Sequence, residues 1–347
     1  MKKERDSNIE LLRIIAMLMI LVLHAIGALG PVSAAERTLS PATSFLRIFW
    51  EQACIIGVNL FIMISGWFGI RASGKGLFSL LFQVAFYAVC IALVFKLTGL
   101  ELTGGVKDVL VACTGMSYWF IPSYLVLYVL SPALNAFTES VPRKTFILLL
   151  VSYFTVQFIY GRFGDQAHFQ VGYSSLSFIG LYLLARFCRK YPSKWTTLSV
   201  AANIALWLGI TLVVSLFNHF TGEGTPLGGP HSTFDYNHPA VIIASLFFFL
   251  AFTRMDFRSK AVNWLATGAF AIYVIHMNYL VAPYYRATMV RLYESSGIWF
   301  FLLLLPAVLS VGLVCILADK VRIPVWDWLW GLLCKTRFGK RISDVSA

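Results

Sequence analysis

The sequence predicts an all-α polytopic membrane protein, and composition, apolar runs and loop charges each support this fold class. Hydrophobic residues make up 59% of the chain and charged residues only 13%, with a mean hydropathy of +0.75. Soluble domains are less apolar than this. Runs long enough to cross a bilayer recur along the chain. About ten transmembrane helices are predicted, near residues 8–28, 46–70, 77–98, 117–138, 145–161, 173–187, 196–217, 238–253, 262–282 and 297–318.

The charges between these runs predict the orientation. With the N-terminus inside, 20 of the 28 Lys and Arg residues fall in the two tails and in alternate loops, as cytoplasmic segments require. Both termini are therefore predicted to be cytoplasmic. The net charge of +12 follows from this topology and favours contact with anionic membrane lipids, whereas no basic stripe with interleaved aromatics indicates nucleic-acid binding. The first run lacks a signal-peptide cleavage pattern and is expected to stay as an anchor.

The chain is predicted to be one transmembrane domain, residues 1–320, followed by a cytoplasmic tail, residues 321–347. In the tail, Trp326, Trp328 and Trp330 precede basic residues, a pattern typical of a short amphipathic helix at the membrane interface. The six cysteines show neither paired spacing nor histidines at metal-ligand spacing. Neither a disulfide framework nor a metal site is expected.

The first predicted span carries Glu10, Arg13 and His24 in a run that otherwise belongs in lipid. Ionisable residues are costly at membrane depth and persist mainly where they have a function. Eleven residues at about 100° each return His24 to within about 20° of Arg13, about 16 Å further along the axis. Glu10 lies three residues before Arg13 and can pair with it. One helix face therefore runs from a charged entrance to a deeply placed imidazole. Alternatively, the two charges only neutralise each other near the membrane interface, and His24 forms a hydrogen bond to a neighbouring helix.

Two other spans contain polar residues of interest. In the second span, Ser65-Gly66 interrupts an aromatic-rich run and Arg71 follows it. Ser65 can hydrogen-bond a substrate carbonyl or the deep histidine, or only the backbone carbonyl four residues before it. In the ninth span, Tyr273 and His276 stand three residues apart on one helix face. A lone buried histidine is usually a core residue. This one is of interest because it occurs together with the other polar residues named above.

Together these features resemble the acyltransferase-3 family of integral membrane acyltransferases, which acylate bacterial surface glycans. The resemblance rests on Arg13-x10-His24, on Asn59-Leu-Phe-x3-Ser-Gly with Arg71 after it, on Tyr273-x2-His276, and on residues 118–128, which are similar to the family's Trp-Phe-x3-Tyr-x2-Leu-Tyr segment. Two departures stand out. Many members carry clustered arginines after the Ser-Gly helix, whereas Arg71 and Lys75 alone follow it here, and Ala269-Phe270 replace the common Ser-Tyr.

The resemblance implies an acyl-CoA-dependent O-acyltransferase of the bacterial cytoplasmic membrane. It would move an acyl group, acetyl by preference, to a hydroxyl of a cell-surface or lipid-linked glycan. The residues expected to bind acetyl-CoA, the cationic ones through its phosphates, are Glu10, Arg13, Arg71 and Lys75. Those expected to be catalytic are His24 as general base, and Ser65, Tyr273 and His276 as candidates for stabilising the oxyanion. Direct transfer and a covalent acyl-enzyme both stay open, and no metal is expected.

A multipass transporter or flippase for an envelope glycan or lipid precursor is the alternative function, because it also needs many helices, buried charges and glycine breaks. Such a protein should show two related halves, and no counterpart of the motif set occurs in the second half of the sequence. A scaffold without catalytic activity is a third reading. The Gly/Pro-rich segment 218–237 is expected to be an outer loop that either admits a glycan or only connects two helices.

Overall fold

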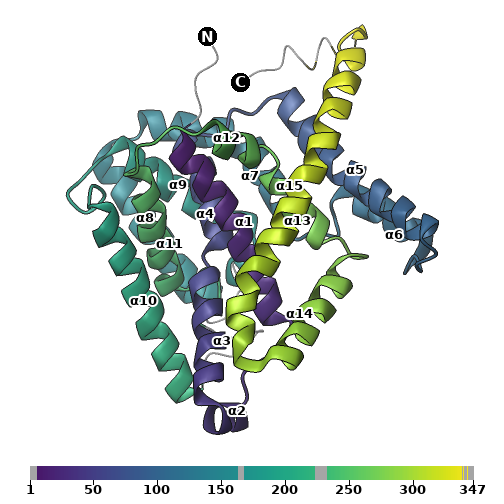
Figure 1. Ribbon diagram of the computed structural model, residues 1–347. Coiled ribbons are helices and arrows are strands. Elements are labelled where there is room, and N and C mark those ends of the chain that lie inside the picture. Colours follow the sequence, from purple (N-terminus) through teal and green to yellow (C-terminus); the bar gives the residue numbers. More distant parts are fainter. Residues whose placement is uncertain (1–5, 163–167, 223–232, 338, 340–341, 343–347) are drawn as a thin grey trace.

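The computed structural model describes residues 6–162, 168–222, 233–337, 339 and 342. Within these ranges the regular elements are all helices, which confirms the predicted fold class (Figure 1). The α-helices are α1 Ser7–Gly27, α2 Ala34–Leu39, α3 Pro41–Cys54, α4 Gly57–Phe68, α5 Gly74–Leu97, α6 Gly105–Thr114, α7 Phe120–Ser140, α8 Arg143–Arg162, α9 Ser175–Lys190, α10 Val200–Thr221, α11 Pro239–Thr253, α12 Lys260–Ala266, α13 Ala269–His276, α14 Ala282–Ser296 and α15 Phe300–Leu333. Two short 3-10 helices are η1 Gln170–Gly172 and η2 Gly297–Trp299.

Seven helical segments within the described ranges are long and apolar enough to cross a membrane. They are Ser7–Gly27, Pro41–Phe68, Gly74–Leu97, Phe120–Ser140, Arg143–Gly161, Val200–Thr221 and Ala282–Leu333. The other three predicted spans correspond to shorter helices, namely α9 with 16 residues, α11 with 15 residues, and the pair α12 and α13. The count of about ten therefore stays a prediction. Part of the predicted outer loop 218–237 lies outside the described residues.

Serine residues define where several helices begin. Each of these serines accepts a hydrogen bond from a backbone N–H in the first turn, which satisfies a donor that the helix itself leaves unpaired. The capping serines are Ser33 for α2, Ser73 for α5, Ser174 for α9, Ser199 for α10 and Ser259 for α12. Apolar runs thus supply the helix interiors, and local serines set their starts.

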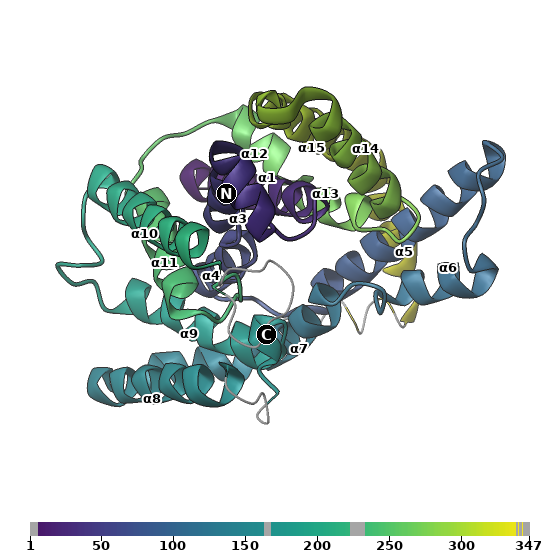
Figure 2. The same ribbon diagram turned by 90° about the horizontal axis from the view of Figure 1, so that it is seen from below.

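Helix α1 lies at the centre of the molecule, with α3, α12, α13 and α15 around it in the view from below (Figure 2). It packs against these helices and also against α4, α11 and α14. By contrast, α10 leaves most of its apolar side chains exposed. The helix that carries Arg13 and His24 therefore has neighbours on many sides, while α10 has the composition of a helix that faces lipid.

Two glycines in α4 allow close helix packing. A Cβ atom at Gly57 would lie 2.9 Å from the Ala16 carbonyl oxygen of α1, and one at Gly66 would lie 2.5 Å from the Tyr182 carbonyl oxygen of α9. Both positions exclude a larger side chain, because small residues let helix backbones approach in membranes. Gly66 of the Ser65-Gly66 segment is thus explained by packing between α4 and α9.

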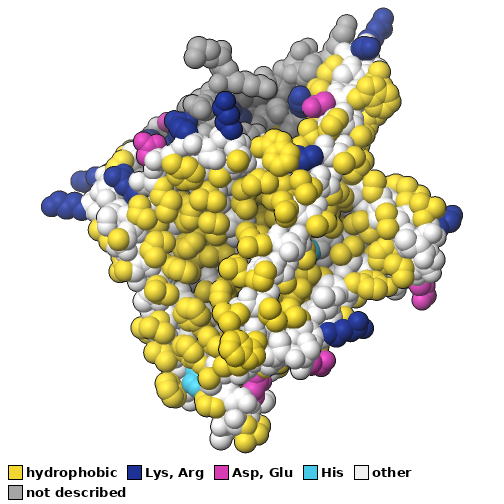
Figure 3. Space-filling view, in the orientation of Figure 1, with side chains coloured by type: hydrophobic (Ala, Val, Ile, Leu, Met, Phe, Trp, Pro, Cys, Tyr) yellow, Lys and Arg dark blue, Asp and Glu magenta, His cyan; other side chains and the backbone are white. Residues whose placement is uncertain are grey.

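The two ends of the molecule differ in charge. Most of the Lys and Arg side chains visible in Figure 3 gather at the end where α1 begins and α15 finishes, and hydrophobic side chains cover the face below it. We call this the basic end, and the end that carries α2 and η2 the opposite end. This separation is what the positive-inside rule requires if the basic end is cytoplasmic, as the loop charges predict.

The C-terminal region differs from the prediction of a separate short helix. Residues 323–333 continue α15, which runs without a break through Pro306 and Pro324. Its 34 residues correspond to about 51 Å, more than the apolar thickness of a bilayer. Contacts with α5 hold the last turns in line: the Trp326 ring lies 5.2 Å from the Phe82 ring, and Lys75 lies over the Trp330 ring at 6.0 Å.

The predicted ninth span is interrupted. It forms α12 and then α13, which meet at Thr267-Gly268 and end at His276. At the break the chain passes close to α15: a Cβ atom at Gly268 would lie 3.0 Å from the Ile316 carbonyl oxygen, so the position suits glycine. The end of α13 is then held by Tyr118, whose hydroxyl donates to the Val274 carbonyl over 2.9 Å.

Candidate active site

Two histidines from distant parts of the chain meet near the far end of α1. Nδ1 of His24 lies 2.9 Å from Nε2 of His276, and the two ring centroids are 5.1 Å apart. His276 is only 1% exposed, whereas His24 is partly exposed. Nε2 of His24 makes no hydrogen bond to any described residue. The pair therefore presents a single accessible imidazole backed by a buried one.

Residues of α14 complete the surroundings of this pair. The Tyr285 hydroxyl donates to the Leu21 carbonyl over 2.8 Å, and its ring meets the His276 ring edge-on with centroids 5.7 Å apart. Arg286 is exposed and interacts electrostatically with both imidazoles. Sequence reasoning missed both residues, because α14 is too polar to be recognised as part of a membrane-embedded site.

The charged entrance predicted on α1 is also formed. Nε of Arg13 donates to Oε2 of Glu10 over 3.2 Å, and the guanidinium lies 5.6 Å from the centroid of the Phe61 ring of α4. Within the described part of the chain, the two terminal guanidinium nitrogens of Arg13 make no hydrogen bond. They stay available for an anionic ligand, and their spacing suits the oxygens of a phosphate.

Ser65 is placed at this entrance and not beside His24. Its hydroxyl donates to the Phe61 carbonyl over 3.1 Å and lies 3.3 Å from the Tyr124 hydroxyl. The reason is the direction of α4: Gly57 lies level with Ala16 of α1, and the eight residues that follow carry Ser65 about 12 Å back towards the start of α1. The structure therefore gives Ser65 the bond to the fourth preceding carbonyl.

Tyr273 and His276, the other two candidates for oxyanion stabilisation, are both enclosed. Tyr273 is 3% exposed and packs against Tyr118, Phe120 and Phe270. No hydrogen bond joins its hydroxyl to either histidine. Both ring nitrogens of His276 already face partners, Nε2 facing His24 and Nδ1 facing the Ile272 carbonyl. The Tyr273 hydroxyl is thus buried without a hydrogen-bond partner among the described residues, whereas both nitrogens of His276 are engaged.

Arg71 and Lys75 are exposed at the basic end. The loop that carries Arg71 is held by α7: Tyr128 bonds both backbone groups of Ser73, at 2.9 and 3.0 Å, and Asn135 donates to the Ile70 carbonyl over 2.9 Å. Tyr128, the last residue of the segment 118–128, and Asn135 further along α7 thus position the loop after α4. Lys75 turns instead towards α15, as described above.

Two arginines of α9 join this end and were missed by sequence reasoning. A Cβ atom at Gly69 would lie 3.0 Å from Nη1 of Arg186, and Nη1 of Arg189 donates to the Trp67 carbonyl over 2.5 Å. Both arginines therefore reach the end of α4.

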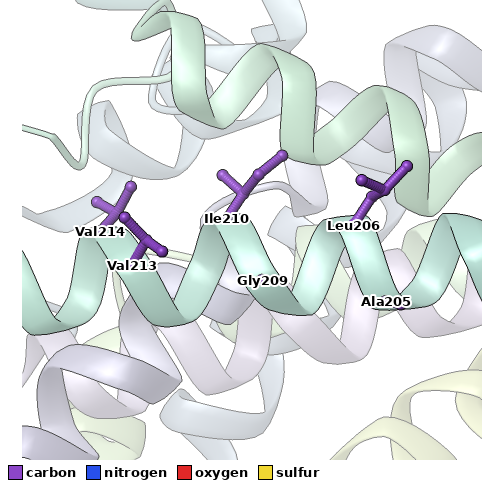
Figure 4. Close-up of a pocket in the computed structure, with 6 residues that line it drawn as sticks. All are labelled: Ala205, Leu206, Gly209, Ile210, Val213 and Val214. Atoms are coloured by element: carbon purple, nitrogen blue, oxygen red, sulfur yellow. The ribbon is translucent and has the colours of Figure 1, made fainter.

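The apolar depression along α10 includes neither histidine of the pair. Figure 4 shows this depression, lined by Ala205, Leu206, Gly209, Ile210, Val213 and Val214. Its lining is apolar, so it offers no group for chemistry. Among the described residues no group of three or more His, Cys, Asp and Glu side chains is arranged to hold a metal ion.

A model of an acyltransferase domain family, Acyl_transf_3, matches residues 6–317. The chain belongs to the acyltransferase-3 family. This confirms the resemblance drawn from the motifs, and with the apolar helices it makes the protein a multi-pass membrane acyltransferase. Comparisons with curated proteins and with solved structures give no match. In this acyltransferase the match covers the entrance at Arg13, the histidine pair and α14.

Proposed function

We propose that this acyltransferase moves an acyl group, acetyl in the first instance, from acyl-CoA to a hydroxyl of a cell-surface or lipid-linked glycan. The observation that carries the proposal is the arrangement along α1. A cationic entrance at Arg13 and a partly exposed imidazole at His24 lie on one face of a single enclosed helix, about 16 Å apart. This separation suits a donor whose charged end stays at one membrane surface while its thioester reaches inward.

The donor is proposed to bind with its phosphates at the basic end. Arg13 offers two guanidinium nitrogens without a partner among the described residues, and Arg71 is exposed in the loop after α4. Arg189 adds positive charge at the end of the same helix, where Arg186 also lies, paired with Glu139 over 2.6 Å. Charge-assisted hydrogen bonds to phosphate are among the stronger polar contacts. Glu10 then orients Arg13 and does not itself touch the donor.

The reaction is proposed to occur at His24. Its Nε2 takes the proton of the acceptor hydroxyl while the hydroxyl oxygen attacks the thioester carbonyl. The carbon–sulfur bond breaks, and the departing thiolate takes the proton to give free CoA. Because Tyr273 and His276 are enclosed and Ser65 lies at the entrance, Arg286 is our candidate for stabilising the oxyanion.

The setting is proposed to be the bacterial cytoplasmic membrane, with the basic end inside. Acyl-CoA is then met at the inner surface, and the acceptor is met near the opposite end, where His24 lies. The match of residues 6–317 to an acyltransferase domain favours this enzyme over a transporter.

The test measures release of free CoA from acetyl-CoA by the purified protein in lipid nanodiscs, with a surface-glycan fraction as acceptor. We expect His24→Ala to lower acceptor-dependent turnover by about 10²–10⁴-fold, the usual contribution of general acid–base catalysis. His219→Ala is the matched control, because His219 packs against Phe45 of α3 and has no proposed part in the reaction. Equal turnover in the two variants would remove His24 from the mechanism.

A second arm separates the transferase from a flippase. Radiolabelled acetyl should appear on the glycan fraction only when donor, acceptor and wild-type protein are all present. Movement of a lipid-linked glycan across vesicles without acetyl transfer would instead support the transporter.

A further inference from the structure

The hydrogen bonds of the histidine pair determine where its protons lie. Nδ1 of His276 faces the Ile272 carbonyl oxygen, and a carbonyl can only accept, so this nitrogen carries a hydrogen. A neutral imidazole has one N–H, which leaves Nε2 of His276 as an acceptor. The nitrogen 2.9 Å away, Nδ1 of His24, must therefore carry the hydrogen between them. Nε2 of His24 is then left with a free lone pair.

The other neutral arrangement is unfavourable. A hydrogen on Nε2 of His24 would leave its Nδ1 lone pair facing the Nε2 lone pair of His276 at 2.9 Å. Moving the His276 hydrogen to remove this conflict would set its Nδ1 lone pair against the Ile272 carbonyl. His276 is 1% exposed, so water cannot relieve either conflict, and unpaired polar atoms are costly where water is excluded.

The surroundings hold His276 in this role. It ends α13, whose neighbouring carbonyl at Val274 is bonded by Tyr118. Tyr285 packs edge-on against the His276 ring and bonds the Leu21 carbonyl, three residues before His24 on α1. Tyr285 therefore links the two helices that carry the histidines.

We propose that His276 is a positioning residue that holds His24 in the tautomer with a bare Nε2, so that the accessible nitrogen is always the basic one. This inference rests on the proposed function of His24 as the base. When His24 takes the acceptor proton at Nε2, the new positive charge is shared through the hydrogen bond to His276. Sulfur receives that proton in the last step, which restores the starting tautomer.

The first test needs no variant at position 276. Ring nitrogens of ¹⁵N-histidine-labelled protein are observed by NMR at a pH where the histidines are neutral, and the His24 signals are identified by their loss in His24→Ala. We expect a protonated Nδ1 and an unprotonated Nε2 for His24 in the wild type. A protonated Nε2, the form that free histidine prefers, would overturn the proposal even if the protein is an active acyltransferase.

The second test compares two substitutions. His276→Gln keeps an acceptor oxygen near the position of Nε2, so turnover should stay within about tenfold of wild type, with the His24 tautomer kept. His276→Leu keeps bulk but removes the acceptor, and kcat should fall by about 10²–10⁴-fold with KM for acetyl-CoA unchanged, as for loss of the correct tautomer in a catalytic triad.

The outcomes distinguish this inference from the proposed function. Wild-type kcat and pH profile in His276→Leu would exclude a positioning role and leave His24 as the base. Equal losses of kcat in His276→Gln and His276→Leu, with the tautomer unchanged in both, would mean that residue 276 only packs. Full activity of His24→Ala would instead refute the proposed function itself.

Discussion

Two clusters of ionisable side chains among the described residues, the histidine pair and a carboxylate network on α15, differ in what remains unpaired. Asp319 is fully buried. Its Oδ1 accepts from Gln83, Tyr87 and Nε of Arg322, at 3.0, 2.9 and 2.6 Å, and its Oδ2 accepts from Nη2 of Arg322 at 3.0 Å. His24 is partly exposed and keeps one nitrogen without a partner among the described residues.

This difference indicates different roles. The Asp319 network joins α5 to α15 and offers nothing to a ligand, so it reads as a structural link between helices. The histidine pair joins α1 to α13 and still has a basic atom facing outward. An ionisable residue at membrane depth indicates a function. Which of the two clusters can react depends on whether an atom is left without a hydrogen-bond partner.

The largest effect on stability is expected from Asp319→Ala. The substitution leaves Arg322, which is 6% exposed, without its counter-charge, and breaking such a pair costs about 3–5 kcal/mol. Thermal unfolding in detergent should show a clearly lower midpoint. The double variant Asp319→Leu/Arg322→Met removes both charges and should recover most of the loss. If the single variant is as stable as wild type, the network is not the link described here.

A large effect on catalysis is expected from Arg286→Ala. Loss of an oxyanion donor costs about 10²–10³-fold in kcat, and the folded state should be unaffected because Arg286 is exposed. Arg291→Ala is the matched control, since Arg291 is exposed on the same helix and has no assigned role. Steady-state kinetics that give the same kcat for both variants would remove Arg286 from the site.

A smaller effect is expected from Arg13→Ala. Charge-assisted hydrogen bonds contribute about 1.5–3 kcal/mol, so KM for acetyl-CoA should rise by about tenfold or more while kcat changes little. Arg143→Ala serves as the control, because Arg143 is engaged with the Tyr191 ring at 5.8 Å. A fall in kcat with an unchanged KM would place Arg13 nearer the reaction than proposed.

The smallest effect is expected from Tyr87→Phe. It removes one of the donors to Asp319 and keeps the ring, so the free energy of unfolding should fall by about 0.5–1.5 kcal/mol with turnover unchanged. Paired measurements of unfolding midpoint and CoA release would show this. A loss of turnover without a loss of stability would mean that the Asp319 network also takes part in the reaction, contrary to the structural role described here.

Local sequence patterns predicted much of this molecule correctly. The helical membrane class followed from composition and run length, and α1, α5, α7 and α10 lie close to their predicted ranges. The observed helix boundaries differ from the predicted ranges at two places where helices meet. Helix α15 continues through Pro324, where its tryptophans pack on α5. The ninth span breaks at Gly268, where the chain passes close to α15.

The candidate site was predictable only in part. The face of α1 from Arg13 to His24 follows from helical periodicity within one segment. Contacts between different helices leave no periodic pattern in the sequence. Ser65 lies beside Tyr124 and away from His24, because α4 runs antiparallel to α1. Arg186 reaches the end of α4 from α9. Tyr285 and Arg286 belong to α14, whose polar sequence gave no indication that this helix lies beside the histidine pair.

The sequence by itself determined that the chain is a helical membrane protein, that its basic residues gather at one end, and that one helix carries an ion pair and a histidine on a common face. These properties depend on residue type and on spacing along a single helix. Only the tertiary structure decided that His24 meets His276, that Asp319 is fully satisfied, and which nitrogen is left free. Those results depend on distances between atoms that lie more than 200 residues apart in the chain, and a hydrogen bond exists only when its two atoms are brought within about 3 Å of each other.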